Sequence, residues 1–282
     1  MKIKANEPQL HDRGGLKMAQ YSGISGERVF ITGATSGLGF AMAKALLSKG
    51  AKVFVTGRNP KKVNQAVYEL RSLRLPDGVC HGAVVDVRAE QSIRSGLAEM
   101  LQLWSGIDIL INNAGIGMRT VNPRFFTEPK PFWEVSADGF RNLIDTNLTG
   151  YFLVAKEIVP HLLKKGSGRI INISVNHETM RRKGFVPYGP SRAGAESLSQ
   201  IMAQDLASSG ITVNMLLPGG ATDTGMVPEE FPASMREQLL SPDVMAEPIL
   251  FLCSDEAKGV NDLRIVAKDF TRWKEQWSQS RG

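Results

Sequence analysis

A glycine-rich turn between a short apolar strand and a helix constrains the fold more than any other feature of this sequence. The strand is predicted at Val29–Thr32, and Gly33, Gly37 and Gly39 follow it. Apolar residues then recur with helical spacing at Leu38, Ala41, Met42, Ala45 and Leu46. Glycine allows positive φ and lets backbone N–H groups approach a pyrophosphate at a helix N-terminus. The pattern predicts a phosphate-binding turn within a βαβ unit, although a plain tight connection would also use glycine.

The alternation of short apolar runs with helix-length segments continues along the chain. This order is typical of βαβ units and a parallel sheet. Long helices are expected at about 137–165 and 188–208, and no repeat or linker divides the chain, so residues 27–282 are expected to form one domain. The predicted strands are Val29–Thr32, Lys52–Thr56, His81–Val85, Ile109–Asn112, Arg169–Ile173, Thr212–Leu216 and Leu263–Ala267.

The first 26 residues show no sustained periodicity, and a second methionine, Met18, shortly precedes the first strong apolar run. We therefore expect residues 1–26 to be a poorly ordered extension outside the fold. This segment also lacks the apolar core of a secretory signal, and no apolar run approaches the roughly 18 to 20 residues that span a bilayer. These features predict a soluble protein.

Composition narrows the class of protein further. The chain has 282 residues, of which 42% are hydrophobic and 22% charged, so global disorder is excluded. Cys80 and Cys253 cannot build a disulfide framework and have no metal-ligand spacing, which fits the cytoplasm and no metal site. The net charge of +6 is scattered rather than clustered with aromatic residues, so neither nucleic acid nor a membrane is expected as a partner.

Further motifs follow the glycine-rich turn in a fixed order. Asp86 ends the third predicted strand, Asn112-Asn113-Ala114-Gly115 follows the fourth, and Pro218-Gly219 follows the sixth. Asn147 lies in TNLTG, and Tyr188 begins YxxxR. Over about residues 27–268 the chain resembles the classical short-chain dehydrogenase/reductase family. The resemblance implies an α/β, three-layer, doubly wound Rossmann fold with about seven parallel strands, and a nicotinamide dinucleotide across their carboxyl ends.

The resemblance also implies which residues surround the dinucleotide. The glycine-rich turn would border the pyrophosphate, the third strand the adenine, and the segment after the sixth strand the nicotinamide. The cofactor-binding residues expected in this way are Thr32, Gly33, Thr35, Ser36, Gly37, Leu38, Gly39, Arg58, Asn59, Asp86, Val87, Asn113, Ala114, Gly115, Tyr188, Arg192, Pro218, Gly219, Thr222 and Thr224.

The end of the second strand predicts which dinucleotide binds. An NAD site needs a carboxylate there for the ribose hydroxyl, whereas the 2′-phosphate of NADP needs a cation. The sequence has Arg58 and Asn59 at this point and no acid. We therefore predict NADP(H), with its phosphate held by Arg58 and by Asn59 or Ser36; the alternative is that Arg58 is a solvated loop charge.

The catalytic residues match the family only in part. Family members that transfer hydride use Asn, Ser, Tyr and Lys, and Asn147 and Tyr188 occupy two of these positions. Val175 stands at the serine position, and Ser174, one residue earlier, should point away from the cleft unless the strand bulges. Asn176 is an alternative donor. Arg192 replaces the lysine, keeping the positive charge but not readily giving up a proton.

These features favour an NADP(H)-dependent reductase of a carbonyl or imine, with Tyr188 as acid or base and Arg192, Asn147, Asn176 or Ser174 assisting. The alternatives are an isomerase, cyclase or dehydratase on the same fold, or a dinucleotide-sensing protein. Substrate loops are expected at about 116–136 and 220–240, and the resemblance implies a homodimer or homotetramer. Expected substrate contacts are Met118, Phe126, Val175, Asn176 and Met226, with Arg119 and Arg124 as candidates for binding a substrate carboxylate or phosphate.

Overall fold

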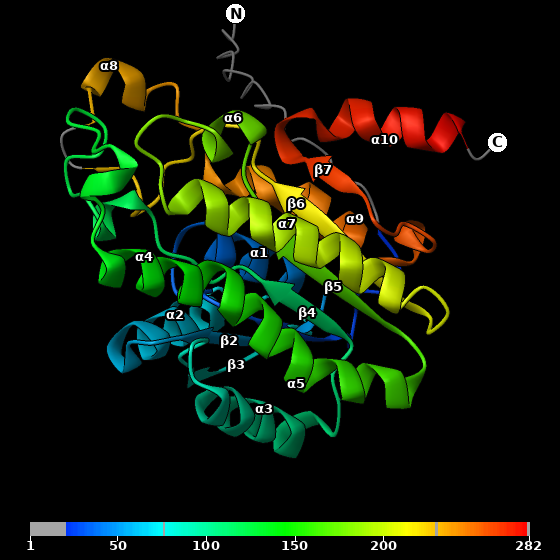
Figure 1. The fold of residues 1–282 in the computed structure, drawn as a ribbon. Helices are drawn as coiled ribbons and strands as arrows, with labels where there is room; N and C mark the ends of the chain where they lie inside the picture. Colours follow the sequence, from blue (N-terminus) through cyan, green and yellow to red (C-terminus); the bar gives the residue numbers. More distant parts are fainter. Residues whose placement is uncertain (1–20, 76, 229–230, 281–282) are drawn as a thin grey trace, which may run out of the picture.

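The protein is built on one parallel sheet of seven strands in the order β3-β2-β1-β4-β5-β6-β7 (Figure 1). The computed structural model describes residues 21–75, 77–228 and 231–280. Every predicted strand overlaps an observed one, so the predicted doubly wound α/β fold is confirmed. The strands are β1 (Arg28–Ile31), β2 (Lys52–Gly57), β3 (Val79–Val84), β4 (Ile109–Asn112), β5 (Gly168–Ile173), β6 (Ile211–Leu217) and β7 (Arg264–Val266).

Helices cover both faces of the sheet because successive strand side chains point to opposite sides. Val29 and Ile31 of β1 are buried in one apolar cluster, and Phe30 is buried in the other. The first cluster includes α1 (Gly37–Leu47), α2 (Pro60–Ser72) and α9 (Ala246–Leu252), and the second includes α3 (Glu90–Trp104), α5 (Gly150–Lys165) and α7 (Tyr188–Asp205). Figure 1 shows α5 and α7 in front of the sheet and α1 and α9 behind it.

The helix expected over residues 137–165 is interrupted. The structure has α4 (Ala137–Ile144), a π-helical turn at Asp145–Thr149, and then α5. A π-helical turn inserts one extra residue per turn and often occurs at functional sites. Shorter helices are α6 (His177–Met180) and α8 (Ala233–Arg236), and α10 (Phe270–Gln279) ends the described chain.

Residues 21–26 pack against the body of the protein, so the expectation that they lie outside the fold is wrong. Ile24 is only 1% exposed. The Tyr21 hydroxyl donates to Glu247 at 3.0 Å and accepts a hydrogen bond from Lys274 at 2.9 Å, which ties this segment to α9 and α10. Apolar burial and these polar contacts hold residues 21–26 in place, although their sequence shows no periodicity. Residues 1–20 lie outside the described residues.

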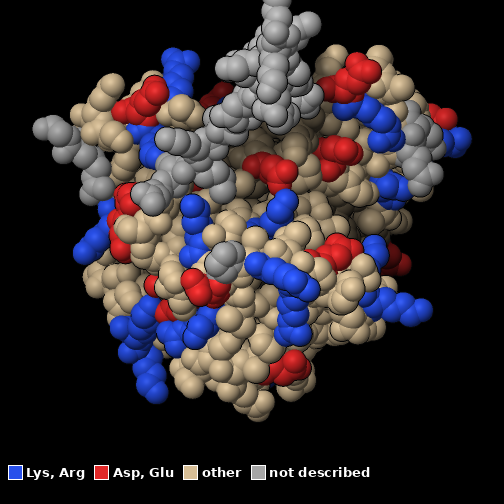
Figure 2. Space-filling view, turned by 180° about the vertical axis from the view of Figure 1, so that it is seen from behind, with Lys and Arg blue, Asp and Glu red and all other residues tan. Residues whose placement is uncertain are grey.

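The charges on the face behind the sheet are mixed. Figure 2 shows lysine and arginine side chains interspersed with aspartate and glutamate over this face. Both cysteines are buried and free. Within residues 21–75, 77–228 and 231–280, no helix has the length and apolar character to span a bilayer, and no cluster of potential metal ligands occurs.

Candidate active site

A cleft of about 1200 Å³ lies at the carboxyl ends of the strands, where a doubly wound sheet binds its ligands. Figure 1 shows β4 and β6 pointing toward the side of the molecule on which α8 lies. Most of the predicted site residues line this one cleft, although they come from distant parts of the sequence. They are Gly33, Thr35, Ser36, Gly37, Leu38, Arg58, Asn59, Asp86, Val87, Asn113, Ala114, Gly115, Met118, Phe126, Ser174, Val175, Asn176, Tyr188, Arg192, Pro218, Gly219, Thr222, Thr224 and Met226.

The glycine-rich turn forms a cradle at the start of α1. Gly33 and Gly37 both have positive φ, at 65° and 56°. A Cβ atom at Gly33 would lie 2.6 Å from the Cα of Ala114, so a larger residue would push the turn away from the end of β4. The first turn of α1 contains no acidic residue. The free N–H groups at this helix N-terminus therefore provide a suitable environment for a phosphate group.

Thr32 and Gly39 do not line the cleft and instead support the cradle from behind. The Thr32 hydroxyl is fully buried and accepts from the backbone N–H groups of Asn113 and Ala114 at 3.0 Å. The Asn113 side chain donates to the carbonyls of Thr32 and Gly33. A Cβ at Gly39 would meet that amide at 2.5 Å, so glycine is needed where α1 packs on β4. These bonds fix the cradle to the neighbouring strand.

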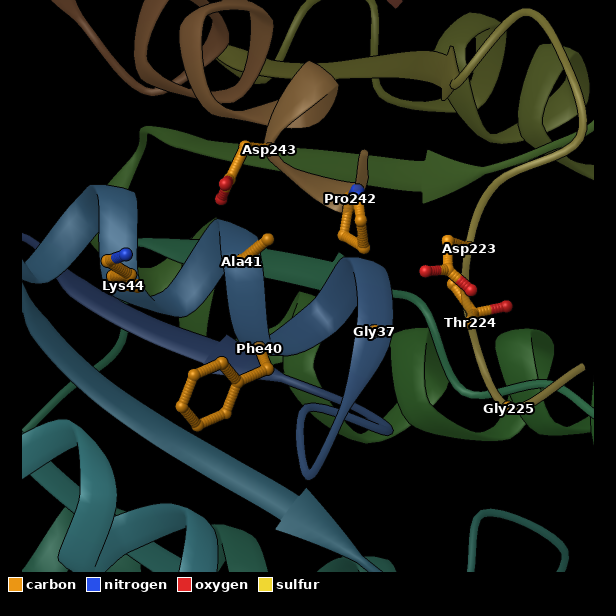
Figure 3. A pocket seen from close by; sticks show the side chains of 9 residues that line it. All are labelled: Gly37, Phe40, Ala41, Lys44, Asp223, Thr224, Gly225, Pro242 and Asp243. Carbon is orange, nitrogen blue, oxygen red and sulfur yellow. The ribbon is translucent and has the colours of Figure 1, made fainter. Parts of the chain in front are cut away.

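A smaller cavity of about 520 Å³ lies beside the cradle. Figure 3 shows α1 contributing Gly37 and Lys44 on one side, with Thr224 and Asp243 on the other. Gly37, Thr224 and Gly225 line both cavities, so these residues separate the smaller cavity from the cleft.

The end of β2 presents two cations to the cleft. Arg58 and Lys62 are exposed and line it. The carbonyl of the Asn59 side chain accepts from the backbone N–H of Lys62 at 3.1 Å, so Asn59 caps α2. Asp86, after β3, is paired with Arg88 at 2.6 Å; the hydrogen bond from Arg88 is the main cause that lowers the pKa of Asp86. The Asp86 charge is thereby neutralised, and Arg58 and Lys62 give this end of the cleft positive charge.

The centre of the cleft holds a buried arginine between two tyrosines. Arg192 is only 3% exposed, and its guanidinium carbon lies 5.4 Å from the ring centre of Tyr188 and 5.8 Å from that of Tyr151. Its Nη1 donates to the Tyr151 hydroxyl at 2.9 Å and to the carbonyl of Ile173 at 3.1 Å. Burial alone lowers the pKa of Arg192, but interactions with Tyr151 and Tyr188 outweigh burial and raise the pKa. The guanidinium therefore stays charged beside the Tyr188 ring.

The guanidinium of Arg192 also packs against the segment that follows β4. A Cβ at Gly115 would overlap Nη2 of Arg192, so a larger residue at this position would displace the guanidinium. Nε of Arg192 is buried and makes no hydrogen bond within the described protein. A buried donor without a partner costs free energy, and a ligand oxygen in the cleft would recover that cost.

Asn147 lies in the π-helical turn and supports the cleft wall. Its carbonyl oxygen accepts from the backbone N–H of Ile116 at 2.8 Å, and its amide donates to the Ile116 carbonyl at 3.0 Å. The same amide reaches the Ser191 hydroxyl at 3.3 Å, which in turn donates to the carbonyl of Tyr188. Asn147 is fully buried and does not line the cleft. It links the segment after β4 to the start of α7.

The Ser174 hydroxyl is bound to a neighbouring helix. It donates to Glu196 on α7, and Glu196 also accepts from Arg264 at 2.8 Å. Ser174 borders the cleft, but its hydroxyl is engaged by Glu196. Val175 instead packs with the apolar cluster that includes Tyr188, and the Asn176 amide donates to the carbonyl of Gly219 at 3.1 Å.

The two predicted substrate loops meet over the cleft. Arg119 donates to the carbonyl of Gly225 at 3.0 Å, and the rings of Phe126 and Phe231 lie 4.9 Å apart. Arg124 forms an ion pair with Glu128 at 3.0 Å and does not line the cleft, so its predicted role toward a substrate is not supported.

Sequence reasoning missed several residues of this site, among them Lys62, Phe185, Tyr151 and Arg182. Tyr151 follows Asn147 by four residues, a spacing that places both side chains on one helical face and could have identified it. Arg182 lines the cleft but lies in the basic run 181–183, which resembles an ordinary solvated surface.

Comparison with known proteins agrees with the fold and the cleft. The family model for short chain dehydrogenases matches residues 27–234. The chain is 33% identical over 245 residues to 3-oxoacyl-(acyl-carrier-protein) reductase FabG of Aquifex aeolicus (strain VF5), covering 84% of this chain and 94% of that one. It is 32% identical over 198 residues to gluconate 5-dehydrogenase of Gluconobacter oxydans (strain 621H), covering 70% and 72%.

Two solved structures carry dinucleotides. The 3-ketoacyl-(acyl-carrier-protein) reductase from Brucella melitensis complexed with NADH has a TM-score of 0.74 at 26% identity, over 86% of this chain and 97% of that one. A variant of actinorhodin polyketide ketoreductase with NADPH has a TM-score of 0.73 at 26% identity, over 87% and 97%. The chain therefore belongs to the short-chain dehydrogenase family of oxidoreductases.

Proposed function

We propose that this protein is an NADP(H)-dependent reductase of a carbonyl or imine, with Tyr188 as the proton donor. The observation that carries the proposal is the buried guanidinium of Arg192, held 5.4 Å from the ring centre of Tyr188 on the wall of the cleft. A fixed cation beside a phenol stabilises the phenolate that remains after the proton has left.

The residues of the cleft fit a dinucleotide with a 2′-phosphate. The cradle at Gly33 and Gly37 offers backbone N–H groups to a pyrophosphate, and Arg58 and Lys62 offer cations at the end of β2 where an NAD site has a carboxylate. The partnerless Nε of Arg192 is a donor for a ribose hydroxyl. When bound, NADPH supplies the hydride.

The protein's own residues then hold the substrate and move one proton. Tyr188 donates its hydroxyl proton to the substrate oxygen or nitrogen as negative charge develops there. Arg192 keeps its own proton, because burial lowers its pKa but the two tyrosine neighbours outweigh burial and raise the pKa above its already high ordinary value. Arg192 therefore stabilises the negative charge on the Tyr188 phenolate, but it does not relay a proton as a lysine can. The proton lost from Tyr188 must therefore return from solvent through the cleft.

The substrate end of the cleft lacks the serine hydroxyl that would stabilise an oxyanion. Val175 occupies that position, and the Ser174 hydroxyl is bound to Glu196. An imine or iminium needs less help from an oxyanion donor than a simple ketone does, so electron-poor or protonated acceptors are favoured.

A second function, on the same cleft but without redox chemistry, is favoured by the contacts of Arg192. Its Nη1 is fully used by Tyr151 and Ile173, and the oxyanion donor is missing. An isomerase, cyclase, dehydratase or dinucleotide sensor would need the NADP(H) cradle but not the complete set of reductase residues.

The test follows NADPH oxidation by its near-ultraviolet absorbance for the wild type and Tyr188→Phe with ketones, quinones and cyclic imines. Binding of NADPH is first measured by fluorescence for both proteins. Turnover that falls at least about 100-fold in Tyr188→Phe, with NADPH binding unchanged, supports the reductase. Tight NADPH binding without oxidation of any acceptor instead supports the second function.

A further inference from the structure

A further cation faces the substrate end of the cleft. Arg182, just beyond α6, lines the cleft, and its guanidinium carbon lies 5.2 Å from the ring centre of Phe185 and 5.9 Å from that of Phe126. Stacking on aromatic faces stabilises a guanidinium and leaves its N–H groups free at the edge. The geometry therefore holds a positive charge against the apolar wall of the cleft.

The wall behind Arg182 continues to the proposed proton donor. Phe185 contacts Arg182 on one side, and its ring centre lies 6.3 Å from that of Tyr188 on the other. Phe125 packs against the edge of Phe185 at 5.6 Å, and Phe231 packs on Phe126 at 4.9 Å. The aromatic rings that carry Arg182 therefore line the part of the cleft next to Tyr188.

The backbone fixes this cation relative to the cleft. The N–H of Phe185 donates to the carbonyl of Arg182 at 3.1 Å, and the N–H of Gly189 at the start of α7 donates to the carbonyl of Phe185 at 2.7 Å. Gly184 between them has a φ of 76°, and a Cβ there would meet Pro129 at 2.6 Å. The turn at residues 182–185 is thus hydrogen-bonded to α7 and packs against the first substrate loop.

Arg182 has no carboxylate partner among residues 21–75, 77–228 and 231–280. Arg124 is paired with Glu128, and Arg119 hydrogen-bonds the carbonyls of the other loop, so both are already used. The single acidic residue among the described residues that line the cleft is Asp86, which is paired with Arg88 beside the end of β2. Among the described residues, the charged side chains at the substrate end are therefore all positive.

We propose that Arg182, stacked on Phe126 and Phe185, binds the anionic group of the substrate. The substrate class is then an apolar, preferably aromatic, carbonyl or imine compound that carries a carboxylate or a phosphate ester. Arginine recognises both anions through paired N–H donors, and the rings bind the apolar body. The inference rests on the proposed function, because it assigns the part of the same cleft that would select the substrate of the reductase.

The test measures binding without requiring turnover. Benzoate, phenyl phosphate and uncharged benzamide are titrated by calorimetry into the protein saturated with NADPH, which occupies the cations at the end of β2. We expect at least one anion to bind about 10- to 100-fold more tightly than benzamide, and this preference to be lost in Arg182→Ala and Arg182→Gln. The anion with the lower Kd distinguishes a carboxylate from a phosphate ester. Arg181→Ala, an exposed neighbour that does not line the cleft, should keep the preference.

Two results would overturn the inference. The first is binding of both anions no tighter than benzamide, and the second is a preference that survives in Arg182→Gln while circular dichroism shows a folded protein. Anion binding that depends on Arg182, without NADPH oxidation by any keto acid, would leave the anion site standing and contradict only the reductase. If NADPH does not bind, an anion could also occupy the phosphate cradle. In that case, an anion affinity that falls in Arg182→Gln but not in Arg181→Ala shows that the anion binds at Arg182.

Discussion

Arg192 and Tyr151 form a buried hydrogen bond of 2.9 Å, from Nη1 of the guanidinium to the phenol oxygen. The Tyr151 hydroxyl donates in turn to the carbonyl of Ile173 at 3.1 Å. Burial raises the pKa of Tyr151 above its ordinary value, and Arg192 partly opposes this effect, so Tyr151 stays protonated at neutral pH. Tyr151 supplies the acceptor that holds the Arg192 guanidinium in the cleft.

This pair predicts a strong coupling between two substitutions. Tyr151→Phe removes the acceptor of a buried charge and should lower kcat/KM about 10- to 100-fold, and Arg192→Lys should also lower it. The double variant should lose less than the product of the two separate losses, because the shorter lysine does not need the phenol oxygen. Steady-state kinetics with NADPH measure all four proteins.

Tyr68→Phe is the matched control for that cycle, since Tyr68 is 69% exposed on α2 and should show wild-type kinetics. If the fold-loss of kcat/KM in the double variant equals the product of the two single losses, the coupling between Tyr151 and Arg192 is contradicted.

Arg58 should determine the cofactor preference. Arg58→Ala removes a cation next to the expected 2′-phosphate, so KM for NADPH should rise about 10- to 100-fold while KM for NADH changes little. The measurement is KM for each dinucleotide at a saturating concentration of acceptor. Arg272→Ala on α10, also exposed, is the control. An equal rise for both dinucleotides would mean that Arg58 does not read the phosphate.

The adjacent residues 174 and 175 should behave in opposite ways. Val175→Ser places a hydroxyl in the cleft and should raise ketone turnover on the order of 10-fold, because an oxyanion donor is restored. Ser174→Ala should leave turnover near the wild-type value and lower the free energy of unfolding by about 1 kcal/mol, since Glu196 loses one donor. Kinetics and thermal unfolding measure the two effects. Unchanged ketone turnover in Val175→Ser would mean that residue 175 does not occupy the serine position.

Asp108 should make stability depend on acid pH. Burial alone raises its pKa, but hydrogen bonds from Arg28 and Lys165 outweigh burial and lower the pKa to about 2. Because the pKa in the unfolded chain is about 3.9, the stabilisation is complete above roughly pH 4 and is lost as the pH falls toward 2. Asp108→Asn should lower the free energy of unfolding at pH 7 by about 1–3 kcal/mol and flatten the dependence between pH 4 and 2.

Urea unfolding at several pH values measures this effect, and Asp138→Asn is its control because the Asp138 side chain is 98% exposed. The same acid dependence in Asp108→Asn as in the wild type would show that other carboxylates cause it.

The sequence by itself determined the succession of strands and helices along the chain and the place of the cleft at the carboxyl ends of the strands. Strand and helix periods depend on residues close together in the chain, and the glycine-rich turn has few conformations other than the one observed.

The tertiary structure alone decided which side chains meet across distant segments. Tyr151 pairs with Arg192 across 41 residues, and Arg182 stacks on Phe126 in another loop. Residues 21–26 showed no periodicity but are held by α9 and α10. Periodicity reports only a residue's own element, whereas these contacts depend on the packing of elements joined by long loops, so no local pattern in the sequence records them.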